Sequence, residues 1–379
     1  MKSHLSFVLF TATAALLPFA SANSRSLCAV KFRGTCEPPY VEAEEKEIER
    51  LYQDALEEGG HVNVLAGGDL PFASVGIVKA FEKRFPGTTL NITMDISKYH
   101  DVLIDRQLAQ GGGALETDVA HLQTIQNFPR WKSEGRLMQY KPVGFSHLYD
   151  PYKDEEGYYW PTHINFFTNL VSTSIPPDQR PTEAQDYLKP QFFGGKIMYT
   201  YPNDDDAILY QFMKVIEENG EDWMRAFIRQ KPIAVRGTGT PPFYINNGTC
   251  LVTFTSKSSL TPDATAKSLT LLPKKTFFQS WAQQGGIFNE AKHPAAAKLY
   301  VSWLTSYNVQ KTLYSHIWSP RVDIPPPPGY KHIWDIENTD PLGFQSYMQN
   351  RTKVEEDKAY IQQFVGPVRG VSSLRLSYS

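Results

Sequence analysis

Three consecutive carboxylates, Asp204-Asp205-Asp206, stand before an apolar segment in this 379-residue chain and are suited to bind a small molecule. One carboxylate at a helix N-terminus is ordinary capping, but three exceed what a cap requires. Their charge would repel phosphate or sulfate and favour a cation, an amine or a polyol. The alternative is a solvated acidic turn. The triplet therefore argues against an inorganic anion as ligand without identifying the ligand.

A second candidate group is Gly67-Gly68-Asp69, which ends the apolar run Val62–Ala66. Glycines let a backbone approach a ligand closely, and the Asp69 carboxylate can accept from an amine or a hydroxyl. The alternative is a tight turn in which Asp69 caps the next helix and Pro71 occupies its first turn. Gln123, just after the third expected strand, is a candidate amide contact.

Aromatic residues near the two expected lobe crossings form a third group. Tyr159 and Trp160, in the run Tyr158-Tyr159-Trp160, could stack on a flat ligand or cover a cation, and Trp281 could form the floor of a cleft. The alternative for all of them is core or hinge packing. His163 is interpreted as a hydrogen-bonded histidine, not a metal ligand.

Arg236 precedes an alternating Gly-Thr-Gly-Thr segment. Its guanidinium could pair with a carboxylate. The alternative is a flexible loop held by turn glycines.

No reaction centre can be recognised in the sequence. The chain has no Gly-X-Ser-X-Gly, His-Glu-X-X-His or phosphate-loop motif, and nothing singles out a catalytic pair among its 40 acidic residues. No CxxC or His/Cys cluster indicates a metal site. We therefore predict no catalytic residue, no metal and no cofactor; a secreted hydrolase with unmarked catalytic residues stays an alternative.

The first 22 residues have the pattern of a cleaved secretory signal. Lys2 and His4 precede an apolar run that ends at Ala20-Ser-Ala22 and is too short to span a bilayer comfortably. A retained anchor is the alternative. The sequence thus predicts a secreted, extracellular protein.

The cysteines and sequons agree with export. Cys28 and Cys36 are expected to close a small disulfide loop, and Cys250, in an apolar run, is expected to be a buried thiol. Asn91, Asn247 and Asn350 each begin an Asn-X-Ser/Thr triplet that is compatible with glycosylation.

The overall composition narrows the partners. A formal net charge of −2 gives no reason to expect nucleic acid, and no stretch after the signal is apolar enough to span a membrane. We expect a monomer that binds a small-molecule solute, with any cell-surface partner unknown.

From residue 61 onward, strands alternate with helical segments, as in α/β proteins with mostly parallel sheets. An acidic amphipathic helix over 41–58 comes first, with Ile48, Leu51, Tyr52, Ala55 and Leu56 on its apolar face. Chain crossings near 140–144 and 280–286 predict two lobes with a cleft between them. The expected organisation is as follows: signal 1–22; disulfide loop and amphipathic helix 23–60; first lobe 61–143 plus 287–325; second lobe 144–286; C-terminal helical extension 326–379.

The order of these segments resembles extracellular solute-binding proteins of the type II periplasmic-binding fold. It is most similar to the ferric-iron and thiamine-binding branch, in a version found in secreted fungal proteins. The likeness covers about residues 60–325 and implies two α/β lobes that close on a solute like a hinged clamp. It rests on these segments: Val62–Asp69 with its helix, Leu108-Ala-Gln-Gly-Gly with Thr117-Asp-Val-Ala-His-Leu, Trp131–Tyr140, Leu188–Ile197, and Pro294–Leu304 with Asn308-Val-Gln-Lys.

The sequence departs from this family at one functional point. Ferric-binding relatives coordinate iron through adjacent tyrosines after a strand equivalent to Leu251–Phe254, whereas Thr253–Ser258 contains no tyrosine. Phenolate oxygens suit Fe³⁺, so this form of ferric site is not expected. The remaining alternative is a secreted interaction or effector protein that kept the fold and lost its cleft.

Overall fold

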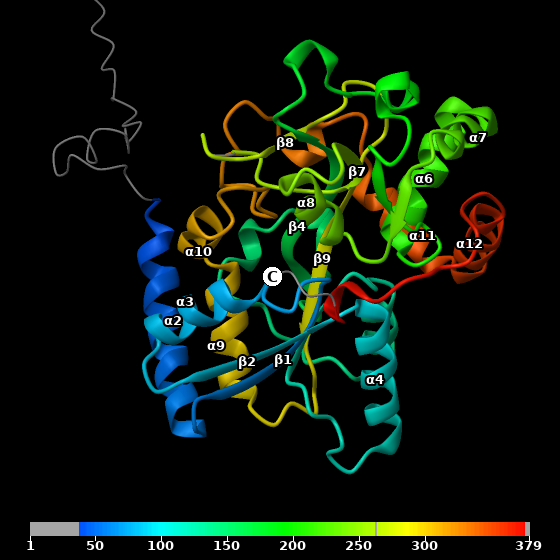
Figure 1. The fold of residues 1–379 in the computed structure, drawn as a ribbon. Coiled ribbons are helices and arrows are strands. Elements are labelled where there is room, and N and C mark those ends of the chain that lie inside the picture. Colours follow the sequence, from blue (N-terminus) through cyan, green and yellow to red (C-terminus); the bar gives the residue numbers. More distant parts are fainter. Residues whose placement is uncertain (1–37, 262–263, 376–379) are drawn as a thin grey trace, which may run out of the picture. The chain divides into compact units, whose positions relative to one another are not determined.

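The computed structural model describes residues 38–261 and 264–375, and residues 41–379 form one compact unit (Figure 1). The expected signal segment 1–22, Cys28 and Cys36 lie outside the described residues.

A seven-stranded mixed sheet runs through this unit. The parallel pairing expected from the sequence holds for β1–β2, β1–β3 and the separate two-stranded sheet β5–β6, whereas every pair that involves β4 or β9 is antiparallel. The large sheet has the order β2 (Thr89–Asp95), β1 (His61–Gly67), β3 (Val119–Leu122), β9 (Gln279–Ile287), β4 (Trp160–Ser172) and β7 (Val252–Ser256), with β8 (Ser268–Leu271) also paired to β4.

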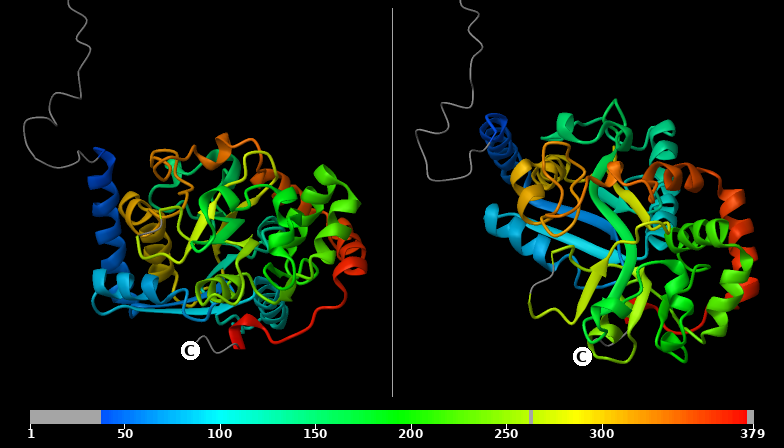
Figure 2. Two further views of the ribbon diagram at one scale, coloured as in Figure 1. Left: turned by 45° about the horizontal axis from the view of Figure 1, so that its top comes forward. Right: turned by 90° about the horizontal axis from the view of Figure 1, so that it is seen from above.

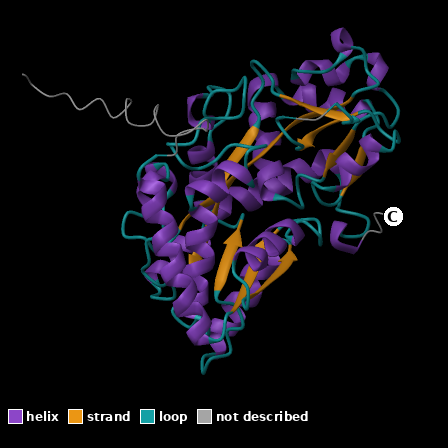
Figure 3. Ribbon diagram, turned by 90° about the vertical axis from the view of Figure 1, so that its left-hand side faces the viewer, coloured by secondary structure: helices purple, strands orange, loops and turns teal. Residues whose placement is uncertain are grey.

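β4 and β9 connect two lobes. β9 pairs with β3 through Leu122 and Gln284 at one end and with β4 through Phe167 and Gln279 at the other. β4 continues past this point to pair with β7 and β8. We call the half built on β1–β3 the first lobe and the half that contains β5–β8 the second lobe; Figure 3 shows the strands of each with helices around them.

The helices of the first lobe bury their apolar faces against β1–β3. In α2, Ile48, Leu51 and Ala55 are buried as expected, whereas Leu56 is 37% exposed. α3 begins at Val75, so Pro71 is not in its first turn; residues 71–74 form turns instead. The helices are α2 (Tyr40–Glu58), α3 (Val75–Arg84), α4 (Ser97–Gln110), α5 (Asn127–Ser133), α9 (Pro294–Thr305) and α10 (Tyr307–Thr312).

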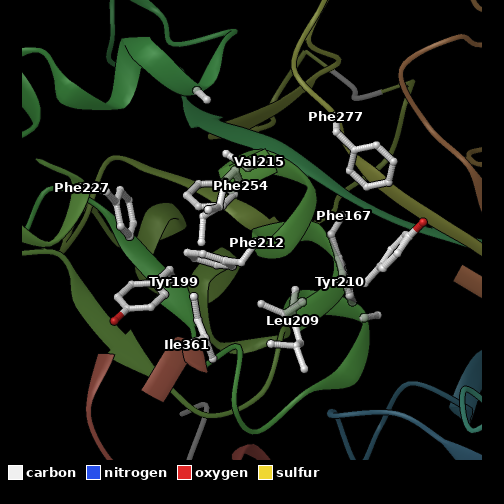
Figure 4. Close-up of a cluster of buried hydrophobic side chains, with 14 of the residues drawn as sticks. Phe167, Tyr199, Leu209, Tyr210, Phe212, Val215, Phe227, Phe254, Phe277 and Ile361 are labelled. Atoms are coloured by element: carbon white, nitrogen blue, oxygen red, sulfur yellow. The ribbon is translucent and has the colours of Figure 1, made fainter. Parts of the chain in front are cut away.

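An aromatic core fills the second lobe. Phe212, Phe227 and Phe254 pack together within it, and Tyr199 and Tyr210 lie beside them (Figure 4). Its elements are β5 (Met198–Thr200), α6 (Asp206–Asn219), α7 (Glu221–Arg229), β6 (Ile233–Val235) and α8 (Thr240–Asn246).

The C-terminal segment is helical and folds back on the second lobe. Phe344, Met348, Val354 and Ile361 join the same hydrophobic cluster as α6 and α7, and Figure 2 shows these helices side by side. The helices are α11 (Pro341–Gln349) and α12 (Arg351–Val365), after which residues 373–375 form a short 3₁₀ turn.

Candidate functional site

The end of β1 and the loops that follow β1, β3, β5 and β6 meet between the two lobes, and together they carry seven of the residues singled out from the sequence. Backbone groups at strand ends are free for ligands, which is why α/β proteins bind there. In this structure the first-lobe and second-lobe side chains bond directly to one another.

Asp69, after β1, bonds to the loop after β6. The backbone N–H of Thr238 donates to Asp69 Oδ2 at 2.6 Å, and the Thr238 hydroxyl donates to the same oxygen. Asp69 therefore does not cap α3, whose N-cap is Ser74. Burial raises the pKa of the Asp69 carboxyl, against the opposing effect of the Thr238 bonds.

Asp204 is held by two cations from different lobes. Lys98 Nζ in α4 lies 2.9 Å from Asp204 Oδ1, and Arg236 Nε lies 2.7 Å from Oδ2. Desolvation alone would raise the pKa of the Asp204 carboxyl, but the bonds from Arg236 and Lys98 outweigh it and hold that pKa below its ordinary value. Arg236 Nη2 also donates to Tyr99 Oη at 3.4 Å. Asp204 thus forms the charged bridge of the junction.

Asp205 combines a capping role with a contact across the lobes. Its Oδ1 accepts from the N–H groups of Ala207 and Ile208 at 2.9 and 3.0 Å, which makes it the N-cap of α6. The Gln123 side-chain amide donates to the same oxygen at 3.1 Å. Burial, and secondly the charge of Asp69, raises the pKa of Asp205 to about 6. Asp206 faces the C-terminal segment instead, bonded to Arg351 and Lys358.

Gly67 is required by close packing at this edge. A Cβ at Gly67 would lie 1.9 Å from Ser97 Oγ and 3.4 Å from Gln283 Nε2. Ser97 Oγ in turn accepts the Gln123 N–H at 2.9 Å. A Cβ at Gly68 would lie 2.4 Å from Met94 Cε. Both glycines let α4 and the strand ends approach, which fixes the position of Gln123.

Tyr159 and Trp160 are not brought to this junction, whereas Trp281 reaches it only through its Nε1, which donates to Gln283 Oε1 at 3.0 Å. Trp160 is fully buried in the first-lobe core, and Tyr159 packs beside Phe128. Trp281 is 2% exposed and packs against Phe167 in the second-lobe cluster. The core alternative therefore describes their positions better than ligand stacking does, because β4 carries Trp160 and β9 carries Trp281 into hydrophobic clusters.

Sequence reasoning missed a polar group on β4 and β9, the strands that link the lobes, and just after β7. Asn165 Nδ2 lies 3.1 Å from His163 Nε2 and 3.3 Å from Gln283 Oε1, and Lys257, just after β7, donates to Asn165 Oδ1. His163 and Asn165 share one face of β4 because they are two residues apart. That spacing was the available signal, although a polar pair is weak evidence alone in a strand that also contains Thr162, Thr168 and Asn169.

The remaining predicted features have the following surroundings. Asn91, Asn247 and Asn350 are exposed, and Cys250 is a buried free thiol. Within residues 38–261 and 264–375, no three or more His, Cys, Asp or Glu side chains are grouped to hold a metal ion. In the same part of the chain, no helix has the length and apolarity needed to cross a membrane.

The family model for bacterial extracellular solute-binding proteins matches residues 62–316. No curated protein is similar enough in sequence to match the chain.

Several solved structures share the fold at low sequence identity. Iron-bound HitA from Pseudomonas aeruginosa has 14% identity and a TM-score of 0.59, over 79% of this chain and 99% of HitA. AfuA from Actinobacillus pleuropneumoniae, with fructose-6-phosphate bound, has 14% identity and a TM-score of 0.63, over 81% and 99%. A substrate-binding protein of an ABC transporter from Agrobacterium tumefaciens has 10% identity and a TM-score of 0.65, over 80% and 94%. These proteins share the two-lobed fold with this chain.

Proposed function

The chain belongs to the bacterial extracellular solute-binding protein family, and we propose that it is a secreted, non-catalytic protein that clamps a small polar solute between its lobes. The observation that carries this proposal is the set of polar contacts between strand-end loops of opposite lobes. Asp69 bonds Thr238, Lys98 bonds Asp204 and Gln123 bonds Asp205. A solute that enters between the lobes would exchange bonds with these groups.

The charges at the junction favour a cationic or neutral polar solute. Among the described residues, no Lys, Arg or His nitrogen lies within 4.0 Å of the carboxylate oxygens of Asp69 or Asp205, so neither forms an ion pair. Both carboxyls have raised pKa values because of burial. An ammonium or hydroxyl group placed beside them would compensate the ionised forms.

We place the hinge in β4 and β9. Phe145, Leu148 and Trp160 pack in the first-lobe core together with α9. The first crossing is therefore better placed within β4 than at residues 140–144, while β9 supports the second crossing near 280–286. A pair of antiparallel strands that belongs to both lobes can flex without breaking either core.

Iron is not favoured as the solute, although HitA is an iron-bound relative. Thr253–Ser258, at the end of β7, contains no tyrosine, and the phenolate pair on which the ferric interpretation depends is absent there. The sugar-phosphate of AfuA is a nearer chemical precedent, because hydroxyl groups suit the acidic loops.

The test is native mass spectrometry of protein purified from its secretory host, followed by small-angle X-ray scattering before and after removal of the bound solute. We expect a stoichiometric small molecule, and a larger radius of gyration once it is removed. Asp69→Asn should weaken retention of a cationic solute, and Asp54→Asn on the exposed side of α2 is the matched control. A protein that is empty and unresponsive to any solute would favour the alternative, a secreted interaction protein with a degenerate cleft.

A further inference from the structure

Lys257 is a partly buried cation that has no counter-ion among the residues that the structure describes. Its Nζ donates to the neutral Asn165 Oδ1 and lies 5.4 Å from the centroid of the Phe166 ring. Among the described residues, no carboxylate lies within 4.0 Å of it. Burial lowers the pKa of Lys257 to about 8, so the ammonium is still mostly charged at neutral pH.

The ionisable neighbours of Lys257 do not supply negative charge. Desolvation is the main cause that lowers the pKa values of His163 and His316, and the charge of Lys257 lowers them further. Both histidines are therefore neutral at pH 7. His163 bonds Asn165 and stacks on Tyr314, whose pKa burial raises. Buried charges in proteins are normally paired, so this ammonium stands out.

Lys257 belongs to the same junction as the acidic loops. The hydroxyl of its chain neighbour Ser256 donates to the Thr238 carbonyl, and Thr238 binds Asp69. On the other side, Asn165 bonds Gln283, which lies beside Gly67. These contacts connect the surroundings of Lys257 to the end of β1 and to Asp69.

We propose that Lys257 and Asn165 bind an anionic group of the solute, a carboxylate or a phosphate. This inference rests on the proposed solute-binding function and extends it. Because Asp69 and Asp205 on the opposite side favour a cation, the solute class is a compact zwitterion that carries an ammonium and an acid group.

The arrangement explains how one cleft accepts both charges. The ammonium of the solute lies toward the acidic loops after β1 and β5, and the acid group lies toward the end of β7. An inorganic anion would satisfy Lys257 but would leave the two carboxyls without a cationic partner, so it would bind more weakly than the zwitterion.

The test uses isothermal titration calorimetry at pH 6.5 on the full secreted chain with four matched probes. β-Alanine and phosphoethanolamine each carry an ammonium with a carboxylate or a phosphate, ethanolamine carries only the ammonium, and glycerol 3-phosphate carries only the phosphate. The variants are Lys257→Met, which removes the charge, Lys257→Arg, which keeps it, and Lys274→Met at an exposed lysine as the control. Circular dichroism checks that each variant is folded.

We expect at least one zwitterion to bind wild type tenfold or more tightly than ethanolamine. Lys257→Met should abolish that advantage and leave ethanolamine affinity within twofold, while Lys274→Met changes nothing. Binding of β-alanine would identify the anionic group of the solute as a carboxylate, and binding of phosphoethanolamine would identify it as a phosphate.

The remaining outcomes separate this inference from the proposed function. Equal affinity for ethanolamine and both zwitterions, or an advantage that survives in Lys257→Met, overturns the role of Lys257 and leaves the clamp intact. If glycerol 3-phosphate binds as tightly as phosphoethanolamine and needs Lys257, the anionic subsite stands and the cationic preference of the clamp is wrong. Binding of none of the four probes overturns the zwitterion assignment.

Discussion

Lys98 in α4 donates two hydrogen bonds to Asp204, one to its backbone carbonyl at 2.7 Å and one to its carboxylate at 2.9 Å. The first residue belongs to the first lobe and the second to the loop before α6 in the second lobe. Any separation of the lobes at this point breaks both bonds. Their strength is moderate, because the Lys98 side chain is 39% exposed and solvent screens it.

Lys98→Met should shift the protein toward an open form. Loss of a partly exposed ion pair of this kind costs about 1 kcal/mol, which changes the ratio of closed to open protein about fivefold. Small-angle scattering of the solute-free protein measures the change as a larger radius of gyration. Lys79→Met, at an exposed site in α3, should leave the curve unchanged; identical scattering from both variants would show that the bridge does not hold the lobes.

Asp205→Asn should change how stability depends on pH. The pKa of Asp205 is raised to about 6 in the folded protein from an ordinary value of 3.8, so the folded state binds this proton more tightly than the unfolded state. Its stabilising effect is present below the ordinary value and is lost as pH rises through 6. Asparagine keeps the N-cap of α6 and cannot ionise.

Urea denaturation at several pH values measures this effect. Wild type should lose stability relative to Asp205→Asn between about pH 4 and pH 6, and the variant should be the more stable protein at pH 7. If the free energies of unfolding of the two proteins changed with pH in parallel, the Asp205 carboxyl would not be desolvated.

Anion affinity should depend on pH through Lys257. Burial lowers the pKa of Lys257 to about 8. An anionic probe should therefore bind tightly at pH values under 8 and progressively more weakly at higher pH. Lys257→Arg should remove the decline, because guanidinium stays charged. Titrations of phosphoethanolamine from pH 6.5 to 9.5 measure the profile, and a wild-type profile that matches that of Lys257→Arg would contradict the assignment.

Gly67→Ala should destabilise the protein and disturb the site together. The added Cβ would lie 1.9 Å from Ser97 Oγ, and such overpacking costs about 1–3 kcal/mol. A second change, Ser97→Ala, removes that oxygen and should restore part of the stability. Gly76→Ala in α3 is the control, since nothing lies within 4 Å of its added Cβ, and it should not destabilise. A Gly67→Ala protein as stable as wild type would show that the strand end is less tightly packed.

Arg321→Met should lower stability without changing solute binding. The guanidinium is fully buried and bonds Glu44, Asp323 and the Thr305 carbonyl. Removal of one partner of a buried ion pair costs about 3–5 kcal/mol, because the other charge stays buried. Denaturation and calorimetry measure the two properties, with Arg50→Met on the exposed face of α2 as the control. A matching loss of solute affinity would place Arg321 in the functional site.

The local elements followed from the sequence because their signals are local. The apolar spacing of α2 and the carboxylates before α6 both indicated helices where the structure has them. The start of α3 was misplaced, since a proline fits either a first helical turn or a preceding turn. The pairing of β4 and β9 was not predicted as antiparallel, because strand partners far apart in sequence leave no local signal.

The sequence by itself determined the two-lobed α/β fold, the loops at the strand ends and the acidic character of Asp204 and Asp205. Only the tertiary structure decided which side chains face one another: it paired Asp69 with Thr238, buried Trp160 and Trp281, and set Lys257 beside Asn165. The physical reason is that hydrophobic burial depends on residue type and periodicity, which the chain displays locally. Contacts between the lobes depend instead on strand pairings across more than a hundred residues, which the folded chain alone specifies.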